Sequence, residues 1–249
     1  MVLPKRTLKP ESIRRECEAS LRRLGVNQID LYQFHWPDES GVAVEDSWAT
    51  MVKLVEEGKV RAAGVSNFNV ELLSRCEAVR HVDSLQPPFS LINRAVGENE
   101  IPWCEQHGTG VICYSPMQSG LLTETFTAAR VTAFSSDDWR RHRSAEFQEP
   151  NLSRNLALRD ALRPIAKRHN TTTSSIAIAW TLTWPGVTGA IVGARNAAQV
   201  EGWIDAAGVN LSPQDLAEIT AALRATRAGK GPNVPRSARG AGVLRTRNC

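Results

Sequence analysis

The stretch that most limits the possible folds runs from Ile29 to Asp38 and reads IDLYQFHWPD. Its first residues are mostly apolar and β-prone, as in a strand that is covered on both faces. His35 and Trp36 follow directly, and Pro37 turns the chain away. In parallel α/β barrels, reactive side chains stand at the carboxyl ends of such strands. We therefore expect His35 and Trp36 to lie at the functional edge of a parallel sheet.

Helical and strand-like segments alternate along most of the chain. Apolar residues recur at helical spacing after Pro10, and Gly25 is placed to end that helix. Regular alternation with short connections predicts a parallel sheet of five strands. The strands are expected at 29–35, 60–65, 83–86, 110–114 and 188–192, and the helices at 10–24, 44–57, 70–80, 98–107, 154–169, 173–183, 196–206 and 213–226.

An open doubly wound sheet and a barrel are the two architectures that such strands can form. An open dinucleotide-binding sheet requires a glycine-rich turn after its first strand. No GxGxxG or Walker motif occurs, and Gly240-Ala241-Gly242 lacks the third glycine and lies near the end of the chain. The sequence therefore gives no support to the open sheet.

Composition indicates one large α/β domain. The chain has 249 residues, of which 42% are hydrophobic and 22% are charged. No apolar run approaches the roughly 20 residues of a membrane helix, and no leader pattern occurs, so we expect a cytoplasmic protein without a membrane role. Five scattered cysteines without a CxxC pair argue against a disulfide framework and against a bound metal.

Two segments depart from this globular composition. Residues 227–249 hold six Lys and Arg residues and no acid, so the net charge of +4 leaves −2 for the rest. We therefore predict a folded domain over 1–226 and an unfolded basic tail over 227–249, without a nucleic-acid partner. The stretch 123–153 is polar and too long for an ordinary connection, which predicts a mobile functional loop.

The residues that follow the predicted strands form a polar, nearly uncharged set. In a barrel these positions face one mouth. The lack of paired carboxylates disfavours a glycosidase and a divalent metal site. Ser66, Asn67 and Gln86 can hydrogen-bond a carboxamide while Tyr114 stacks on its ring. The full set is His35, Trp36, Ser66, Asn67, Gln86, Tyr114, Ser115, Gly193, Ala194 and Arg195.

Two segments have the properties of phosphate sites. Residues 115–121 read SPMQSGL, and their small and hydroxyl side chains allow a phosphate to approach the backbone. Gly193, Ala194 and Arg195 precede a predicted helix, whose amino end and whose arginine attract phosphate. Two anion sites and one amide site together describe a nicotinamide dinucleotide.

In combination these motifs resemble the aldo-keto reductase family. The resemblance extends from about residue 10 to residue 226, and each motif is specific only together with the others. The matching segments are SIRRE at 12–16, LRRLG at 21–25, DLYQFHWP at 30–37, GVSNF at 64–68, LQ at 85–86, YSP at 114–116, GLL at 120–122 and IVGAR at 191–195, with Gln199.

The resemblance implies an eight-stranded (β/α)8 TIM barrel that binds NADP(H) and moves hydride between nicotinamide and a small-molecule carbonyl substrate. His35 matches the catalytic histidine that orients the carbonyl, and Trp36 lines the substrate pocket. Cofactor contacts are implied for Ser66, Asn67 and Gln86 at the nicotinamide amide, Tyr114 at its ring, Ser115, Pro116, Met117, Gln118, Ser119, Gly120 and Leu121 at the pyrophosphate, and Gly193, Ala194, Arg195 and Gln199 at the adenosine phosphate. Gly202 and Trp203 replace the usual Glu and Asn, so NAD(H) stays open as the alternative.

The sequence departs from the family at its start. Members normally open with three barrel strands that bear a catalytic Asp, Tyr and Lys, and none of these is matched here. Tyr114 is assigned to stacking, and Tyr32 differs in strand parity from His35 and should face the helices. We therefore expect an incomplete barrel with about five of eight strands, inactive or poorly folded alone. The alternatives are a non-catalytic subunit that binds the nucleotide and regulates a partner, or an inactive fragment.

Overall fold

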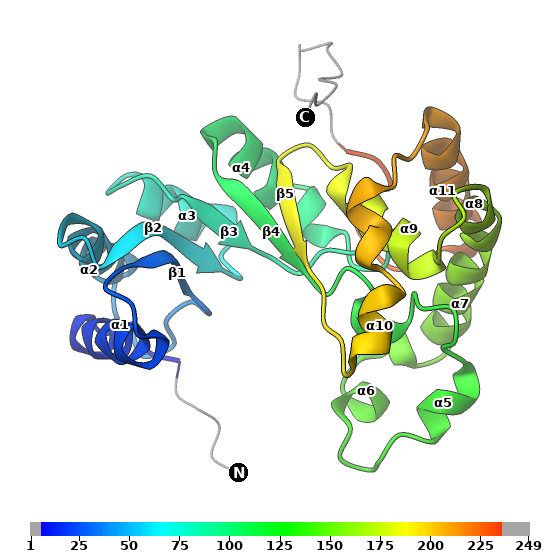
Figure 1. The fold of residues 1–249 in the computed structure, drawn as a ribbon, viewed down its shortest axis with the longest axis horizontal. Coiled ribbons are helices and arrows are strands. Elements are labelled where there is room, and N and C mark those ends of the chain that lie inside the picture. Colours follow the sequence, from blue (N-terminus) through cyan, green and yellow to red (C-terminus); the bar gives the residue numbers. More distant parts are fainter. Residues whose placement is uncertain (1–5, 236–249) are drawn as a thin grey trace.

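The computed structural model describes residues 6–235, and its centre is one sheet of five parallel strands in the order β1-β2-β3-β4-β5 (Figure 1). The predicted five-stranded parallel sheet is confirmed. The strands are β1 (Ile29–Phe34), β2 (Val60–Ser66), β3 (Ser84–Gln86), β4 (Gly110–Tyr114) and β5 (Val187–Ile191).

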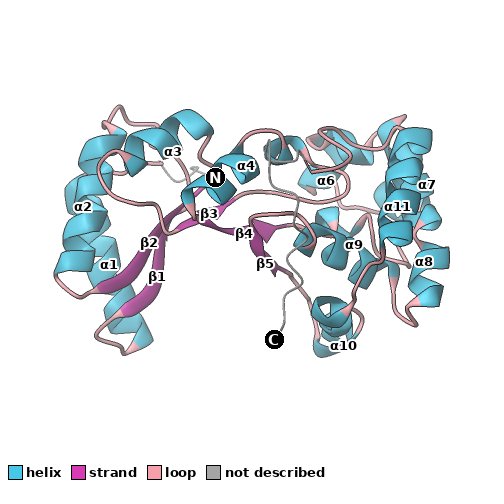
Figure 2. Ribbon diagram, turned by 90° about the horizontal axis from the view of Figure 1, so that it is seen from above, coloured by secondary structure: helices cyan, strands magenta, loops and turns pink. Residues whose placement is uncertain are grey.

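Helices flank the sheet in two groups. Figure 2 shows α1 to α4 beside β1 to β4, and α7 to α11 gathered beyond β5. The helices are α1 (Pro10–Leu24), α2 (Val44–Glu56), α3 (Val70–Glu77), α4 (Glu100–His107), α5 (Ala128–Thr132), α6 (Trp139–His142), α7 (Asn151–Ala161), α8 (Arg163–Arg168), α9 (Thr173–Leu182), α10 (Ala197–Glu201) and α11 (Pro213–Thr226). The 3₁₀ turns are η1 (Ala95–Gly97), η2 (Gln118–Gly120), η3 (Ala145–Phe147) and η4 (Ile204–Gly208).

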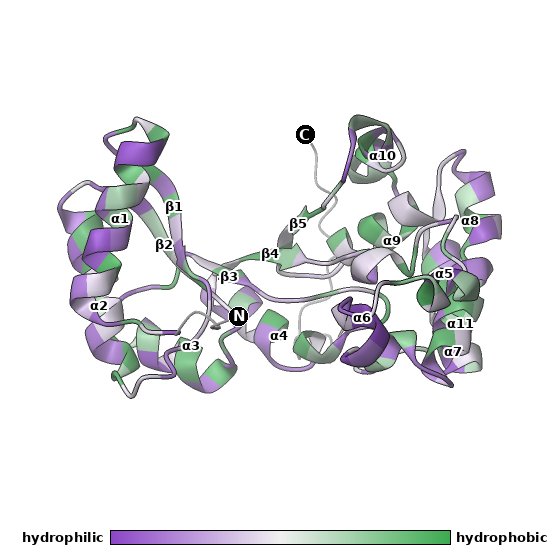
Figure 3. Cartoon of the chain, turned by 90° about the horizontal axis from the view of Figure 1, so that it is seen from below, coloured by the Kyte–Doolittle hydropathy of each residue, from purple (hydrophilic) through white to green (hydrophobic). Residues whose placement is uncertain are grey.

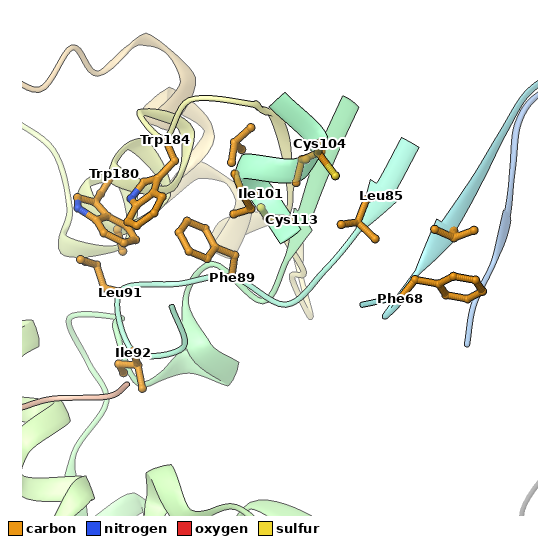
Figure 4. Packing of buried hydrophobic residues seen from close by; sticks show 14 of the residues in the cluster. Phe68, Leu85, Phe89, Leu91, Ile92, Ile101, Cys104, Cys113, Trp180 and Trp184 are labelled. Carbon is orange, nitrogen blue, oxygen red and sulfur yellow. The ribbon is translucent and has the colours of Figure 1, made fainter. Parts of the chain in front are cut away.

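One face of the sheet is sealed against the helices. Leu85 on β3 and Cys113 on β4 are fully buried near Ile101 and Cys104 of α4 (Figure 4). At the other end of this layer, Phe89 stacks on Trp180 with ring centroids 5.5 Å apart. Alternate strand residues point to opposite faces, and this side supplies the hydrophobic core.

The opposite face of the sheet is only partly covered. Leu31, Gln33 and Ala62 are half-buried, as are Ile112 and Tyr114 on β4. Within residues 6–235, β1 pairs only with β2 and β5 only with β4, so both outer strands have a free edge. This face of the sheet therefore remains partly accessible among the described residues.

The stretch 123–153 is built differently from the predicted loop. It contains α5, α6 and η3, and the rings of Phe126, Phe134 and Phe147 pack together with centroids 5.8–6.2 Å apart. The buried guanidinium of Arg159 donates to the Phe126 carbonyl at 2.6 Å and anchors the start of the stretch. The predicted loop thus contains short helical turns, because aromatic residues inside a polar sequence form a small core, and its functional role stays a prediction. In Figure 3, α6 has the colour of hydrophilic residues.

Two predicted helices are shorter than expected. The helix expected at 154–169 is divided into α7 and α8, because Pro164 at the start of α8 has no N–H to donate to the preceding turn. The helix expected at 196–206 is divided into α10 and η4. At Trp203 the backbone leaves the helical region, with φ −153°.

The predicted unfolded tail is wrong for residues 227–235. The side chain of Arg94 is 3% exposed and donates to the carbonyls of Leu91 and Pro232 and to Asn233 Oδ1. The Lys230 N–H donates to the Ile92 carbonyl at 3.0 Å. Carbonyl groups from both segments thus surround a buried cation, which composition cannot reveal. Residues 236–249 lie outside the described part of the chain.

Candidate active site

Side chains at the carboxyl ends of β1 to β4 form one connected group. Ser66 Oγ donates to the Gln86 carbonyl at 2.7 Å, which joins β2 to β3. Asn67 Nδ2 donates to the His35 carbonyl at 3.0 Å, and Tyr114 Oη donates to Asn67 Oδ1 at 2.8 Å. The structure therefore joins five of the ten residues that were expected to meet at this edge.

Asn67 is the centre of this group because of its backbone. Its φ of 63° lies in the left-handed region, which asparagine tolerates better than most residues. This conformation follows the last residue of β2 and lets the Asn67 amide reach both β1 and β4. Left-handed non-glycine residues recur at Ser115, Gln118 and Ser119, directly after β4. Such backbone strain often accompanies functional sites.

His35 and Trp36 lie beside a cavity of about 650 Å³. The His35 side chain is exposed, and its ring centroid is 6.0 Å from that of Trp36. The Arg6 guanidinium lies 4.0 Å from the Trp36 ring centroid and forms an ion pair with Glu39 at 2.7 Å. Tyr32 and Gln33 also line the cavity. The cavity thus combines an imidazole, an indole and a cation at the free edge of β1.

The two tyrosines of the chain have different surroundings. Burial raises the pKa of Tyr32 to about 12, and the other groups that shift it, Cys17, Glu16 and Arg23, are all on α1. Its predicted orientation toward the helices is confirmed. Tyr114 has its hydroxyl bonded to Asn67, and burial raises its pKa as well.

The predicted pyrophosphate loop, 115–121, has a buried residue near each end. Pro116 and Leu121 are buried, whereas the residues between them are half-buried. Gln118 Oε1 accepts a hydrogen bond from Ser90 Oγ at 2.7 Å, which ties the loop to the segment after β3. Ser119 and Gly120 are small residues, and both have a positive φ.

The predicted adenosine-phosphate residues lie beyond β5. Because Ile191 pairs with Tyr114, Gly193, Ala194 and Arg195 emerge at the same edge as Tyr114. They are exposed. The Arg195 N–H donates to Gln199 Oε1 at 2.8 Å, so the Gln199 side chain closes the first turn of α10. The helix expected after these residues is shorter than predicted, since α10 spans only five residues.

Three residues beneath the strand ends were missed by the sequence reasoning. Gln33 Nε2 donates to Ser84 Oγ at 2.9 Å, and Gln86 Nε2 donates to Gln33 Oε1 at 3.1 Å. Gly64 lies level with both Gln33 and Ser84 in the sheet. The available signal was strand parity, because Gln33 shares the inner face with His35.

The site offers polar atoms rather than metal ligands. Among residues 6–235, no three His, Cys, Asp or Glu side chains are grouped closely enough to hold a metal ion. None of the described helices has the length and apolar character needed to cross a membrane.

Comparison with known proteins places this fold and site in context. The model of the Aldo/keto reductase family matches residues 3–224. Aldo-keto reductase YhdN of Bacillus subtilis strain 168 is 35% identical over 212 residues, which cover 85% of this chain and 63% of the relative. The NADH-specific methylglyoxal reductase of Escherichia coli strain K12 is 31% identical over 84% of this chain and 64% of its own length.

A solved structure gives the same result. The glycerol dehydrogenase AKR11B4 of Gluconobacter oxydans is 33% identical, with a TM-score of 0.82 over 95% of this chain and 69% of that chain. The chain spans less than two thirds of the length of the two curated relatives. Its sequence, its parallel sheet and its strand-end residues agree in showing that this chain belongs to the aldo/keto reductase family.

Proposed function

We propose that the carboxyl edge of the sheet binds the nicotinamide half of NADP(H) for hydride transfer to or from a small carbonyl compound. The observation that carries this proposal is the uncharged hydrogen-bonded group of Ser66, Asn67, Gln86 and Tyr114. A carboxamide needs one acceptor and one or two donors, and a flat ring beside it favours stacking. Members of the family typically bind a nicotinamide cofactor and act on small carbonyl substrates.

The pyrophosphate is assigned to the loop 115–121 and the adenosine phosphate to Gly193–Arg195 and Gln199. Strained backbone at Ser115 and Ser119 supports the first assignment, because such turns direct N–H groups outward. The exposed guanidinium of Arg195 supports a 2′-phosphate, and hence NADP(H), because arginine grips phosphate with two donors. The NADH specificity of the Escherichia coli relative keeps NAD(H) as the competing cofactor.

His35 and Trp36 are assigned to the carbonyl substrate. Hydride addition to a carbonyl creates an alkoxide, which must receive a proton, and a positioned acid contributes about 10²- to 10⁴-fold in rate. Tyr32 lies on the helix side of β1 with its pKa raised to about 12, and the Tyr114 hydroxyl is bonded to Asn67, so we assign neither as the donor of that proton. We propose that the five strands correspond to five of the eight in a reductase barrel, and that the 249 residues alone turn over slowly at most.

Because neither tyrosine is assigned as the proton donor, a second candidate is a nucleotide-binding module without catalysis. The two candidates share the cofactor and differ in turnover. The first measurement is quenching of intrinsic tryptophan fluorescence by NADPH and by NADH, in the parent chain and in Tyr114→Leu. Saturable quenching that Tyr114→Leu weakens supports the cofactor site, whereas an equal response in both chains rejects it.

Oxidation of bound NADPH by a small aldehyde then separates the two candidates. His35→Ala should abolish the remaining turnover of a reductase and leave the quenching unchanged. Binding without any turnover favours the module. Absence of saturable binding rejects both candidates together.

A further inference from the structure

The side chain of Gln33 crosses the neighbouring strand and reaches the one beyond it. Gln33 on β1, Gly64 on β2 and Ser84 on β3 are level in the sheet. Gln33 Nε2 donates to Ser84 Oγ at 2.9 Å, although β1 and β3 are not neighbours. A side chain can take this path only if the strand between carries none.

Gly64 provides that path. A Cβ atom at this position would lie 2.7 Å from the Ser84 carbonyl oxygen and 3.1 Å from Gln33 Cγ. Both distances are shorter than ordinary van der Waals contact, so any larger residue would displace the Gln33 side chain. The glycine and the glutamine therefore act as a pair across three strands.

The contact that determines the orientation of the Gln86 amide is its hydrogen bond with Gln33. Gln86 Nε2 donates to Gln33 Oε1 at 3.1 Å, which uses the donor end of the Gln86 amide. Ser66 Oγ donates to the Gln86 main-chain carbonyl at 2.7 Å and lies 3.5 Å from Gln86 Oε1. Among the described residues, the acceptor end of this amide has only that long contact.

We infer that Gln33 is a positioning residue that holds the Gln86 amide with its oxygen toward the strand ends, where it selects ligands with a carboxamide N–H. This inference rests on the proposed function, because it assigns a direction to one contact in the nicotinamide site. An amide that is free to rotate presents its donor as often as its acceptor. By accepting a hydrogen bond from Gln86 Nε2, Gln33 prevents rotation of the Gln86 amide, and Gln33 itself contacts no ligand.

The test compares two dinucleotides that differ only in the group that would hydrogen-bond to the Gln86 amide oxygen. NADPH carries a carboxamide, and its reduced 3-acetylpyridine analogue carries a methyl ketone without the N–H. The parent chain should bind NADPH more tightly by about fivefold to tenfold, the worth of one hydrogen bond. In Gln33→Leu and in Gln86→Leu the ratio of the two dissociation constants should fall to about one.

Two further variants separate positioning from general support. Gln33→Glu keeps an acceptor for Gln86 Nε2 and should keep the parent ratio. Leu31→Ala alters the same face of β1 without touching Gln86 and should also keep it. If Gln33→Leu does not fold, Gln33→Asn tests the same point, because its shorter amide cannot reach across Gly64.

The outcomes distinguish this inference from the proposed function. Equal weakening of both ligands in Gln33→Leu, with an unchanged ratio, overturns the inference and leaves cofactor binding intact. Equal binding of the two ligands by the parent chain would also overturn the inference and leave cofactor binding intact. A parent chain that binds neither overturns the proposed function, and the inference with it.

Discussion

Tyr114 donates its hydroxyl hydrogen to Asn67 Oδ1 at 2.8 Å, which joins the ends of β2 and β4 across the intervening β3. The bond holds a left-handed asparagine and fixes the tyrosine ring at the same time. Two properties of Tyr114, its ring and its hydroxyl, can therefore be tested separately.

We predict that Tyr114→Phe lowers the free energy of unfolding by about 1 kcal/mol, the net value of one hydrogen bond. It should change the NADPH dissociation constant little, because the ring remains. Tyr114→Leu removes the ring and should weaken binding by about tenfold. Urea denaturation and fluorescence titration measure the two effects. As a control, Tyr32→Phe should leave binding unchanged. Equal weakening by the Phe and Leu variants would show that the ring does not contact the ligand.

Gly64→Ala should destabilise the sheet, because its Cβ would lie 2.7 Å from the Ser84 carbonyl oxygen. Overpacking of this kind costs about 1–3 kcal/mol. The matched control is Gly189→Ala on β5, where the nearest atom to a Cβ is 3.9 Å away. That change should be neutral or slightly stabilising, because alanine restricts the unfolded chain. Thermal unfolding measures the stability of both variants. Similar midpoint temperatures for Gly64→Ala and Gly189→Ala would contradict the packing argument.

Asp215 should control stability in acid. Its buried carboxylate would have a raised pKa from burial alone, but hydrogen bonds from Arg168, His169 and Ser212 outweigh burial and hold its pKa well below 3.8. A lowered pKa in the folded state contributes stability above pH about 4, which is lost as pH falls toward the folded pKa. The free energy of unfolding, measured by urea from neutral pH downward, should therefore fall below pH about 4.

Asp215→Asn should make the free energy of unfolding less dependent on acid pH and lower it at neutral pH by about 3 kcal/mol, because His169 loses its carboxylate partner and Arg168 keeps only Glu218. The control is Glu45→Gln. Arg75 lowers the pKa of Glu45 to about 2, but this pair is exposed and is screened by water and salt. At high salt Glu45→Gln should keep the acid dependence of the parent. If the free energy of unfolding of Asp215→Asn still falls below pH about 4 as it does in the parent chain, Asp215 is not the group responsible.

Arg94 should hold the segment 228–233 in place. Burial lowers its pKa to about 10, so it remains charged at neutral pH and needs the carbonyls around it. Arg94→Lys cannot satisfy as many of these carbonyls and should lower stability by about 2 kcal/mol. Trypsin should then cleave after Lys230 more rapidly. Arg224→Lys, an exposed change on α11, is the control, and equal cleavage of both variants would count against the role of Arg94.

Most of the sheet could be predicted because β1, β2, β4 and β5 are short, mainly apolar runs bounded by glycine, proline or polar residues. Ile29–Phe34 and Val60–Ser66 illustrate this. The stretch 123–153 could not, since α5 and α6 are too short for helical periodicity to appear. The burial of Arg94 was equally hidden, because its partner at Pro232 is 138 residues away.

Part of the candidate site followed from one rule, that parallel strands end at a common edge. This rule grouped His35, Asn67 and Tyr114 before their contacts were known. The contribution of Gln33 did not follow, because it depends on the register that sets Gly64 between Gln33 and Ser84. Register arises from pairing between distant segments, and a single strand sequence does not encode it.

The sulfur atoms sealed between sheet and helices have a practical consequence. Burial raises the pKa of Cys76, Cys104 and Cys113 to about 12, so almost no thiolate exists there at neutral pH. An alkylating reagent can reach them only when α3 or α4 lifts from the strands. With Cys17 and Cys249 replaced by serine, the slow rate of modification would measure how often α3 or α4 separates from the strands, and a ligand that stabilises this layer should slow it.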